Sequence, residues 1–151
     1  MIELIKISIF ELRSLVEIAY TGDSDLLDKY WGDGYSLQEA IDANLQQIEK
    51  IKSIVEEAGK EMSFYAVLWK REEIGYVAFF PNNLYSFSIN INYRKPNILS
   101  EYWGAIKKVI GNSFVSQLFP QNTRAINWLK KCGMVEVPAI EDNCVILLNV
   151  E

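Results

Sequence analysis

A short amphipathic helix with defined ends is encoded between Asn122 and Met134. Asn122 suits the N-cap position, because its side-chain oxygen can accept a hydrogen bond from a free backbone N–H, and Pro120 keeps the preceding chain extended. Gly133 stands where a left-handed residue commonly ends a helix. Apolar residues recur between these two signals at helical spacing, at Ala125, Ile126 and Leu129. We therefore expect a helix over about residues 122–132.

The composition favours a single compact domain that spans residues 1–151. Of the 151 residues, 50% are hydrophobic, which is enough to bury one core. The formal net charge is −5 at pH 7. Domains that bind nucleic acid usually carry a basic face, so this charge argues against a nucleic-acid partner and favours a cationic small molecule or a basic protein segment.

The residue types that the chain lacks exclude several chemistries. There is no histidine, the commonest metal ligand and the commonest general base near neutral pH. We therefore expect no metal site, and Ser-His-Asp and Cys-His mechanisms are excluded within this chain. Cys132 and Cys144 lack metal-ligand spacing, so free thiols in a reducing, cytoplasmic setting are expected. The short apolar run at residues 1–10 carries Glu3 and Lys6 and predicts neither a signal peptide nor a membrane span.

Capping signals and periodicity divide the chain into further helices and strands. Ser-x-x-Glu capping boxes at Ser8 and Ser36 predict a helix over about residues 9–20 and a long helix that ends near Gly59. Another helix is expected at about Ile98–Ile110. Runs rich in β-branched and aromatic residues predict strands at Ile2–Ile7, Ser63–Lys70, Ile74–Phe80, Tyr85–Ile91, Phe114–Leu118, Val135–Val137 and Cys144–Val150. The segments that connect Ser63–Lys70, Ile74–Phe80 and Tyr85–Ile91 are short enough for hairpins, which predicts an antiparallel meander.

The C-terminal half of this order resembles the GCN5-related N-acetyltransferase (GNAT) superfamily. The family pattern N-x-x-A-x-x-hydrophobic-Y-x-K-x-G-F is matched by Asn122, Ala125, Trp128, Lys131, Gly133 and Met134, and Leu129 stands where tyrosine is usual. The whole order, β-α-α-β-β-β-α-β-α-β-β, matches that family from end to end. The resemblance implies an α+β fold with a mixed, mostly antiparallel sheet of about seven strands flanked by four helices.

The resemblance also implies where acetyl-CoA would lie as the cosubstrate. In the family, acyl-CoA is held in a V-shaped opening between two strands, which here correspond to Tyr85–Ile91 and Phe114–Leu118. Backbone groups at the end of the first strand would pair with pantetheine, and an N–H near Ile91 would polarise the thioester carbonyl. The implied cofactor-binding residues are Ile89, Ile91, Arg94, Lys95, Asn97, Asn122 and Ala125.

The expected pyrophosphate loop departs from the family pattern R/Q-x-x-G-x-G/A, because only Arg94 of that pattern is present. The glycines let backbone N–H groups close around the phosphates, whereas Pro96 has no N–H and Asn97 and Leu99 carry side chains. Asn97 is also a candidate cap for the following helix. Cationic side chains remain as phosphate ligands, namely Arg94, Lys95, and Lys107 or Lys108. Weak CoA binding is therefore expected.

Catalytic groups are few. In the family's common mechanism a tyrosine returns a proton to the leaving thiolate, which Leu129 cannot do. Tyr93 and Tyr102 are the candidate acids, with Tyr85 as a further tyrosine, and core packing is the alternative role for all three. Glu72 and Glu73 are candidate bases, a role that requires burial to raise their pKa. Cys132 is either an acyl-carrying nucleophile or a structural thiol at a helix end.

The segment 21–35 combines acidic and aromatic side chains, and the resemblance places it beside the acceptor. Asp28, Tyr30, Trp31 and Tyr35 are the candidate residues for an amine, which they would bind by charge and cation–π attraction. The alternative is a solvated acidic loop whose aromatic residues pack on the core. Exposed aromatic residues such as Trp31 and Trp69 also leave room for a homodimer.

Three functions remain open at this point. The first is an N-acetyltransferase that moves an acetyl group from acetyl-CoA to a primary amine of a small molecule or a protein. The second is a GNAT-fold binding or structural module that has lost its cofactor, as in virus- or prophage-encoded relatives. The third is an α+β domain unrelated to acetyltransferases. A clear groove between the two strands favours the enzyme, whereas a groove filled by Leu99, Trp103 or Phe119 favours the module.

Overall fold

The computed structural model describes residues 1–27, 34–139, 141 and 143–150, and this part of the chain forms a mixed sheet of seven strands with the helices α1 to α4. The fold is α+β, and the element order confirms the one expected from the sequence. The elements are β1 Ile2–Ile7, α1 Leu12–Tyr20, α2 Leu37–Glu57, β2 Ser63–Trp69, β3 Glu72–Phe80, β4 Asn83–Ile89, α3 Pro96–Ile110, β5 Phe114–Leu118, α4 Thr123–Lys131, β6 Val135–Val137 and β7 Val145–Asn149.

The strand order in the sheet is β1-β2-β3-β4-β5-β7-β6. Every neighbouring pair is antiparallel except β4 and β5, which are parallel. These two strands share a single paired position, Asn83 opposite Val115, at the N-terminal end of each strand. Because a parallel pair normally continues as an evenly spaced ladder, β4 and β5 diverge from this point toward their C-terminal ends.

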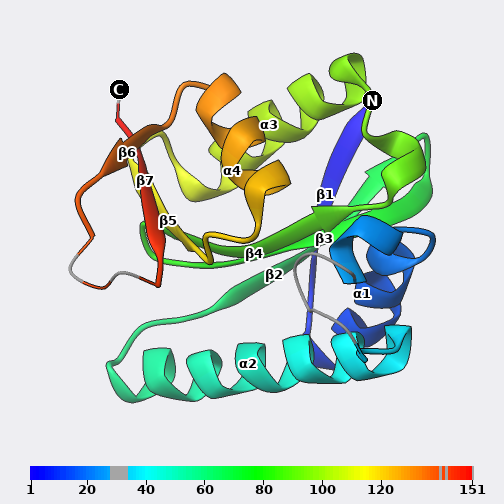
Figure 1. Cartoon of the computed structure of the whole chain (residues 1–151), viewed down its shortest axis with the longest axis horizontal. Helices are drawn as coiled ribbons and strands as arrows, with labels where there is room; N and C mark the ends of the chain where they lie inside the picture. The colour runs from blue at the N-terminus through cyan, green and yellow to red at the C-terminus, as the bar shows by residue number, and fades with distance from the viewer. Residues whose placement is uncertain (28–33, 140, 142, 151) are drawn as a thin grey trace.

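The helices cover both faces of the sheet, with α1 and α2 on one face and α3 and α4 on the other (Figure 1). Each face has its own buried core. Leu12, Leu15, Ile41 and Ile48 pack with the β2 and β3 residues Phe64, Ala66 and Ala78, while the other core unites α3, α4 and the opposite sheet face through Ile98, Ile106, Ile126, Leu129, Val77 and Leu84. Burial of each large aliphatic side chain contributes roughly 1.5–3 kcal/mol. No helix among the described residues has both the length and the apolar composition to cross a bilayer.

Local signals explain where α2 and α4 begin and end. The capping box of α2 is confirmed: Glu39 N donates to Ser36 Oγ at 3.1 Å, and Ser36 N donates to a carboxylate oxygen of Glu39 at 3.2 Å. The end of α4 is also as expected, because Gly133 has φ +106° and the N–H of Met134 bonds to the carbonyl of Leu129 at 3.1 Å.

Three boundary details differ from the sequence expectations. Asn122 is the N-cap of α4, but with ψ of 58° it is not extended and its side chain makes no capping bond. Helix α3 begins at Pro96 rather than near Ile98, because proline suits the first helical position, so Asn97 lies in the first turn and does not cap the helix. Strand β4 ends at Ile89, and Ile91 begins a 3-10 turn at Ile91–Tyr93 instead of extending the strand.

Candidate functional site

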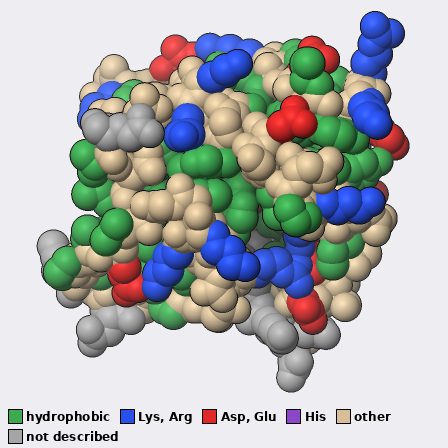
Figure 2. Space-filling view, turned by 90° about the horizontal axis from the view of Figure 1, so that it is seen from above, with side chains coloured by type: hydrophobic (Ala, Val, Ile, Leu, Met, Phe, Trp, Pro, Cys, Tyr) green, Lys and Arg blue, Asp and Glu red, His purple; other side chains and the backbone are tan. Residues whose placement is uncertain are grey.

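A cavity of about 990 Å³ opens where β4 and β5 diverge. Its walls are the second half of β4, the end of β5, the first turns of α3, one side of α4 along its length, and the chain that follows α1, with further lining residues from α2 and β3. Figure 2 shows apolar side chains exposed between the polar groups on the face that carries α3 and α4, with lysine and arginine side chains beside them. The volume is in the range of small-molecule and cofactor sites, about 300–1,000 Å³.

One wall of the cavity is aromatic. The ring of Trp128 stacks on Tyr102 with centroids 5.5 Å apart, lies 5.9 Å from the ring of Phe87 on β4, and meets Trp103 edge-on at 6.0 Å. Such contacts fix the rings relative to one another, so α3, α4 and β4 form a rigid wall. Leu99, Trp103 and Phe119 also line the cavity.

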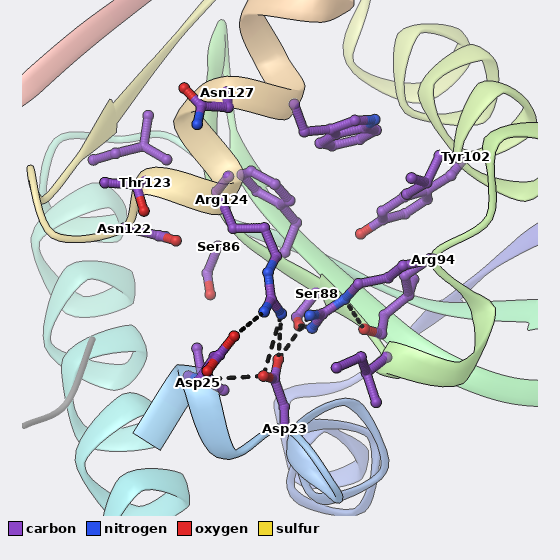
Figure 3. A pocket seen from close by; sticks show the side chains of 18 of the residues that line it. Asp23, Asp25, Ser86, Ser88, Arg94, Tyr102, Asn122, Thr123, Arg124 and Asn127 are labelled. Carbon is purple, nitrogen blue, oxygen red and sulfur yellow. Dashed lines mark hydrogen bonds and ion pairs between the residues drawn. The ribbon is translucent and has the colours of Figure 1, made fainter. Parts of the chain in front are cut away.

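The opposite side of the cavity holds a charge cluster made of Asp23, Asp25, Arg94 and Arg124 (Figure 3). Asp23 is only 1% exposed and pairs with two arginines. Arg94 Nη1 lies 2.7 Å from Asp23 Oδ2, an ion pair whose N–H is not aligned as a hydrogen bond, whereas Arg124 Nη1 donates to both carboxylate oxygens at 3.1 and 3.2 Å. Arg124 Nη2 donates to Asp25 at 3.0 Å.

Local structure fixes the buried members of the charge cluster. Asp23 follows Gly22, whose φ of +79° turns the chain at the end of α1, and Asp23 Oδ1 accepts the backbone N–H of Leu26 at 3.1 Å. Arg94 Nε donates to the carbonyl of Ile89 at 3.0 Å, which turns the side chain inward from the loop after β4. The cluster therefore joins the segment after α1 to both edges of the opening between β4 and β5.

A buried hydroxyl network lies next to the charge cluster, on the side of α2. Asn44 Nδ2 donates to the hydroxyl of Tyr76 at 3.1 Å, and this hydroxyl shares a 2.9 Å hydrogen bond with Ser86 Oγ on β4. Burial raises the pKa of Tyr76, while hydrogen bonds from Ser86, Asn44 and Tyr20 act in the opposite direction. The phenol is therefore neutral near pH 7, and the network offers uncharged polar groups to the cavity.

The two candidate acids occupy different places. Tyr102 lines the cavity, but it is 1% exposed and its hydroxyl donates to the backbone carbonyl of Tyr76 at 3.2 Å. Burial raises the pKa of Tyr102 well above its ordinary value. The Tyr93 hydroxyl donates to Glu72 Oε2 at 2.9 Å, which raises the pKa of Tyr93, and Tyr93 is not among the lining residues. Tyr85 does line the cavity, and burial raises its pKa.

The candidate bases and the candidate thiol lack the features that their roles require. Glu72 and Glu73 are exposed at the start of β3 and do not line the cavity. Cys132 does line the cavity, but burial raises the pKa of its thiol to about 11, which disfavours the nucleophilic thiolate. Cys132 and Cys144 are both free. No group of three or more His, Cys, Asp or Glu side chains in the described ranges is placed to hold a metal ion.

Five of the residues proposed to bind acetyl-CoA line the cavity: Ile89, Ile91, Arg94, Asn122 and Ala125. Lys95 and Asn97 are exposed beside it and are not lining residues. Lys107 and Lys108 lie in the last turn of α3, roughly 16 Å along the helix axis from its first turn at 1.5 Å per residue. They are therefore remote from the N-terminus of α3, and phosphate binding by either of them stays a prediction.

The acceptor residues proposed from the segment 21–35 are mostly outside the described residues. Asp28, Tyr30 and Trp31 fall within residues 28–33, which the structure does not describe. Tyr35 is 44% exposed and is not among the residues that line the cavity. The structure instead places Asp23 and Asp25 of the same segment in the charge cluster.

Sequence reasoning did not identify Arg124, Ser86, Tyr76 or Asn44 as site residues. A signal was present for Arg124, because an arginine two residues after an N-cap lies in the first turn of a helix, where a cation is unfavourable unless it has a partner. Ser86 and Ser88 are polar residues that alternate with Tyr85, Phe87 and Ile89 in the second half of β4, which is a second usable signal for a site.

No protein-family model matches this sequence, and a search of curated proteins gives no significant match. Solved structures with a similar fold do exist. The PaiA N-acetyltransferase from Thermoplasma acidophilum in complex with coenzyme A is 20% identical with a TM-score of 0.65, and the match covers 100% of this chain and 99% of that chain. The aminoglycoside acetyltransferase AAC(6')-Ib in complex with coenzyme A is 14% identical with a TM-score of 0.66, and the match covers 100% of this chain and 95% of that chain.

An acetyltransferase from Thermus thermophilus is 11% identical with a TM-score of 0.67, and the match covers 99% of this chain and 96% of that one. At these identities the comparison bears on the fold, and each match extends over nearly the whole of both chains. In this chain that length comprises the seven-stranded mixed sheet with its single parallel pair and the helices on both faces. The chain therefore has the fold of the GCN5-related N-acetyltransferases.

Proposed function

We propose that this protein is an N-acetyltransferase that moves an acetyl group from acetyl-CoA to a primary amine. The observation that carries the proposal is the opening between β4 and β5, which pair only at Asn83 and Val115 and then enclose a cavity of about 990 Å³. A thin, flexible thioester fits such a site, because its arm lies along a strand edge whose backbone groups are not used by the neighbouring strand. The similarity of the fold to coenzyme A complexes supports the proposal.

Two helix N-termini provide the anion-binding element. Neither Lys95 before α3 nor Asn122 before α4 caps its helix with a side chain, so the first backbone N–H groups remain for a ligand or for water. Pro96, Leu99 and Ala125 from these first turns line the cavity. The diphosphate of CoA would be held at α3, where Pro96 removes one N–H donor and Lys95 adds a cation. This arrangement predicts weaker binding than a glycine-rich loop provides.

The transfer step itself needs little from titratable groups. The neutral amine attacks the thioester carbonyl, the C–S bond breaks, and the amine proton passes through water to the thiolate. Leu129, at the position of the usual acid, is fully buried, and the hydroxyl of Tyr102 bonds to a backbone carbonyl. We therefore assign the acceleration to positioning and to backbone N–H groups at the end of β4. Tyr85, which lines the cavity, is the remaining candidate acid.

The proposal is tested by acetyl-CoA binding and turnover. At a ligand concentration of about 100 times Kd, binding to the folded state alone adds about 2.7 kcal/mol, which raises the Tm of a chain of this size by about 5–11 °C. Release of free thiol from acetyl-CoA, measured with a panel of primary amines, reports transfer. The variant Ala125→Trp fills the opening and should abolish both signals, whereas Lys60→Gln on the exposed turn after α2 serves as the control. The proposal is overturned if millimolar acetyl-CoA neither raises the Tm nor gives thiol release with any amine.

A second candidate function is a GNAT-fold module that binds a ligand without acetyl transfer. It is favoured by the positions of the titratable candidates, since Glu72, Glu73 and Tyr93 are not lining residues and the Cys132 thiol has a pKa of about 11. The open cavity, which Leu99, Trp103 and Phe119 line, favours the enzyme. Saturable binding of acetyl-CoA with no thiol release for any amine would select the module.

A further inference from the structure

Arg124 presents two different edges of its guanidinium group. One edge, Nη1, bonds both oxygens of Asp23, a carboxylate that is 1% exposed and is also paired with Arg94. The other edge, Nη2, bonds Asp25 at 3.0 Å, in a pair whose side chains are 45% and 55% exposed. Figure 3 shows this second edge on the side of Ser86, whereas Ser88 lies on the other side, next to Arg94. One edge is therefore anchored and the other is accessible.

The two edges differ in the free energy needed to release them. Releasing Nη1 would take one of its two partners from Asp23, a carboxylate that is 1% exposed and therefore costly to leave with less compensation. Releasing Nη2 breaks only an ion pair between two half-exposed side chains, which contributes little to stability in water. An incoming anion can therefore replace Asp25 on Nη2 at little cost while Asp23 keeps the guanidinium in place. Arginine is suited to this role, since its planar fork recognises carboxylate and phosphate oxygens directionally.

The charges in the cavity favour an anion over a polycation. Among the described residues that line it, the cations are Arg94, Arg124 and Lys131, and the carboxylates are Asp23 and Asp25. Both carboxylates already pair with arginine. A polyamine would have to break these pairs to gain a partner, and the other polar groups of this wall, from Asn44, Tyr76 and Ser86, are uncharged near neutral pH.

We propose that Arg124 determines acceptor specificity: its Nη2 edge binds an anionic group, a carboxylate or a phosphate, carried by the amine that is acetylated. This inference rests on the proposed acetyl transfer and narrows its acceptor to amines that bear their own negative charge. Asp25 occupies the anion position when no acceptor is bound and returns to it when the product leaves. Asp23 is a positioning residue that acts through Arg124.

The test uses acceptors in matched pairs with acetyl-CoA as donor. Each of a panel of amino acids is compared with its carboxamide, and phosphoethanolamine is compared with ethanolamine, by kcat/KM from thiol release. The kcat/KM of the wild type should be at least about tenfold higher for the anionic member of a pair than for its neutral member. A larger ratio for the amino acids indicates a carboxylate as the bound group, and a larger ratio for phosphoethanolamine indicates a phosphate. Arg124→Gln should bring that ratio close to 1, whereas Asp25→Asn should raise it several-fold by removing the internal competitor. Lys131→Gln removes a positive charge from the same cavity and should leave the ratio unchanged.

Three outcomes would overturn the inference. The first is equal kcat/KM for the anionic and neutral members in the wild type, and the second is a ratio that survives Arg124→Gln in protein shown to be folded by its thermal transition. The third is transfer to spermidine or kanamycin with none to the anionic amines. In each of these cases acetyl transfer is still observed, so the proposed function stands. The absence of thiol release with every amine overturns both the acceptor inference and the proposed acetyl transfer. If Arg124→Gln does not fold, the change in the ratio for Asp25→Asn still tests the inference.

Discussion

The replacement Asp23→Asn removes the negative charge at the centre of the charge cluster and keeps the shape of the side chain. The asparagine oxygen still accepts the N–H of Leu26, which the aspartate accepts at 3.1 Å. What is lost is the charge that compensates Arg94, whose side chain is 17% exposed, and Arg124, which is 45% exposed. The variant therefore isolates the contribution of one buried charge to the folding of the site.

The size of the effect follows from the exposure of each partner. Breaking a buried ion pair costs about 3–5 kcal/mol, and the residual exposure of Arg94 favours the lower end, about 3 kcal/mol. The pair with Arg124 is partly solvated and adds about 0.5 kcal/mol. The free energy of unfolding should therefore fall by about 3.5 kcal/mol, and because about 1 kcal/mol shifts the Tm of a chain this size by 2–4 °C, the Tm should fall by about 7–14 °C.

Urea denaturation followed by circular dichroism measures this loss, with Asp25→Asn as the matched control. Asp25 is 55% exposed, so its variant should lose no more than about 1 kcal/mol. The double variant Asp23→Asn, Arg94→Gln should recover part of the loss, because it no longer contains an uncompensated buried charge. Equal stability of the Asp23→Asn and Asp25→Asn variants would refute the conclusion that Asp23 is the buried anchor of the cluster.

Three further predictions concern single positions. A Cβ at Gly75 would lie 2.1 Å from the carbonyl oxygen of Ser88 in β4. Gly75→Ala should therefore lower the free energy of unfolding by about 3 kcal/mol or more, at or above the upper end of the usual range of about 1–3 kcal/mol for overpacking. A urea midpoint like that of the wild type would contradict this prediction. Tyr76→Phe leaves the buried groups of Asn44 and Ser86 without their shared partner and should lower the free energy of unfolding by about 1–3 kcal/mol in the same assay. The Cys132 thiol, with a pKa of about 11, should be roughly one part in 10⁴ thiolate at pH 7. In a Cys144→Ser background its alkylation rate should therefore rise about tenfold per pH unit up to about pH 10, and a plateau near pH 8 would show that the thiol is not shielded.

Elements defined by local signals were predictable from the sequence. The capping box at Ser36 and the glycine after α4 set helix ends through contacts within a few residues, and the strands follow runs of β-branched and aromatic residues. The two strands that open around the cavity were also identified, because the resemblance rests on the order of elements together with the pattern from Asn122 to Met134. What the sequence could not supply was the conformation of Asn122, whose ψ of 58° prevents the capping bond that its residue type favours.

The site residues depend on contacts between distant positions and on side-chain direction. Asp23 and Arg124 are 101 positions apart, so no local pattern links them. Arg94 was expected to face a phosphate, but the carbonyl of Ile89 and the carboxylate of Asp23 turn its side chain inward. Tyr102 has the residue type of an acid, yet its hydroxyl bonds to a carbonyl of β3. Each case depends on a tertiary partner that sequence periodicity does not reveal.

Amide hydrogen exchange in the presence and absence of acetyl-CoA locates the ligand directly. If the thioester lies between β4 and β5, amides of residues 86–98 and 119–126 should exchange more slowly with acetyl-CoA, because they line the opening or lie in the first turns of α3 and α4. Amides of residues 50–57 in the last turns of α2, on the other face of the sheet (Figure 1) and not among the lining residues, should be unaffected. Unchanged exchange in both ligand-facing segments at saturating acetyl-CoA, or protection confined to α2, would contradict the conclusion that this opening is an acyl-CoA site.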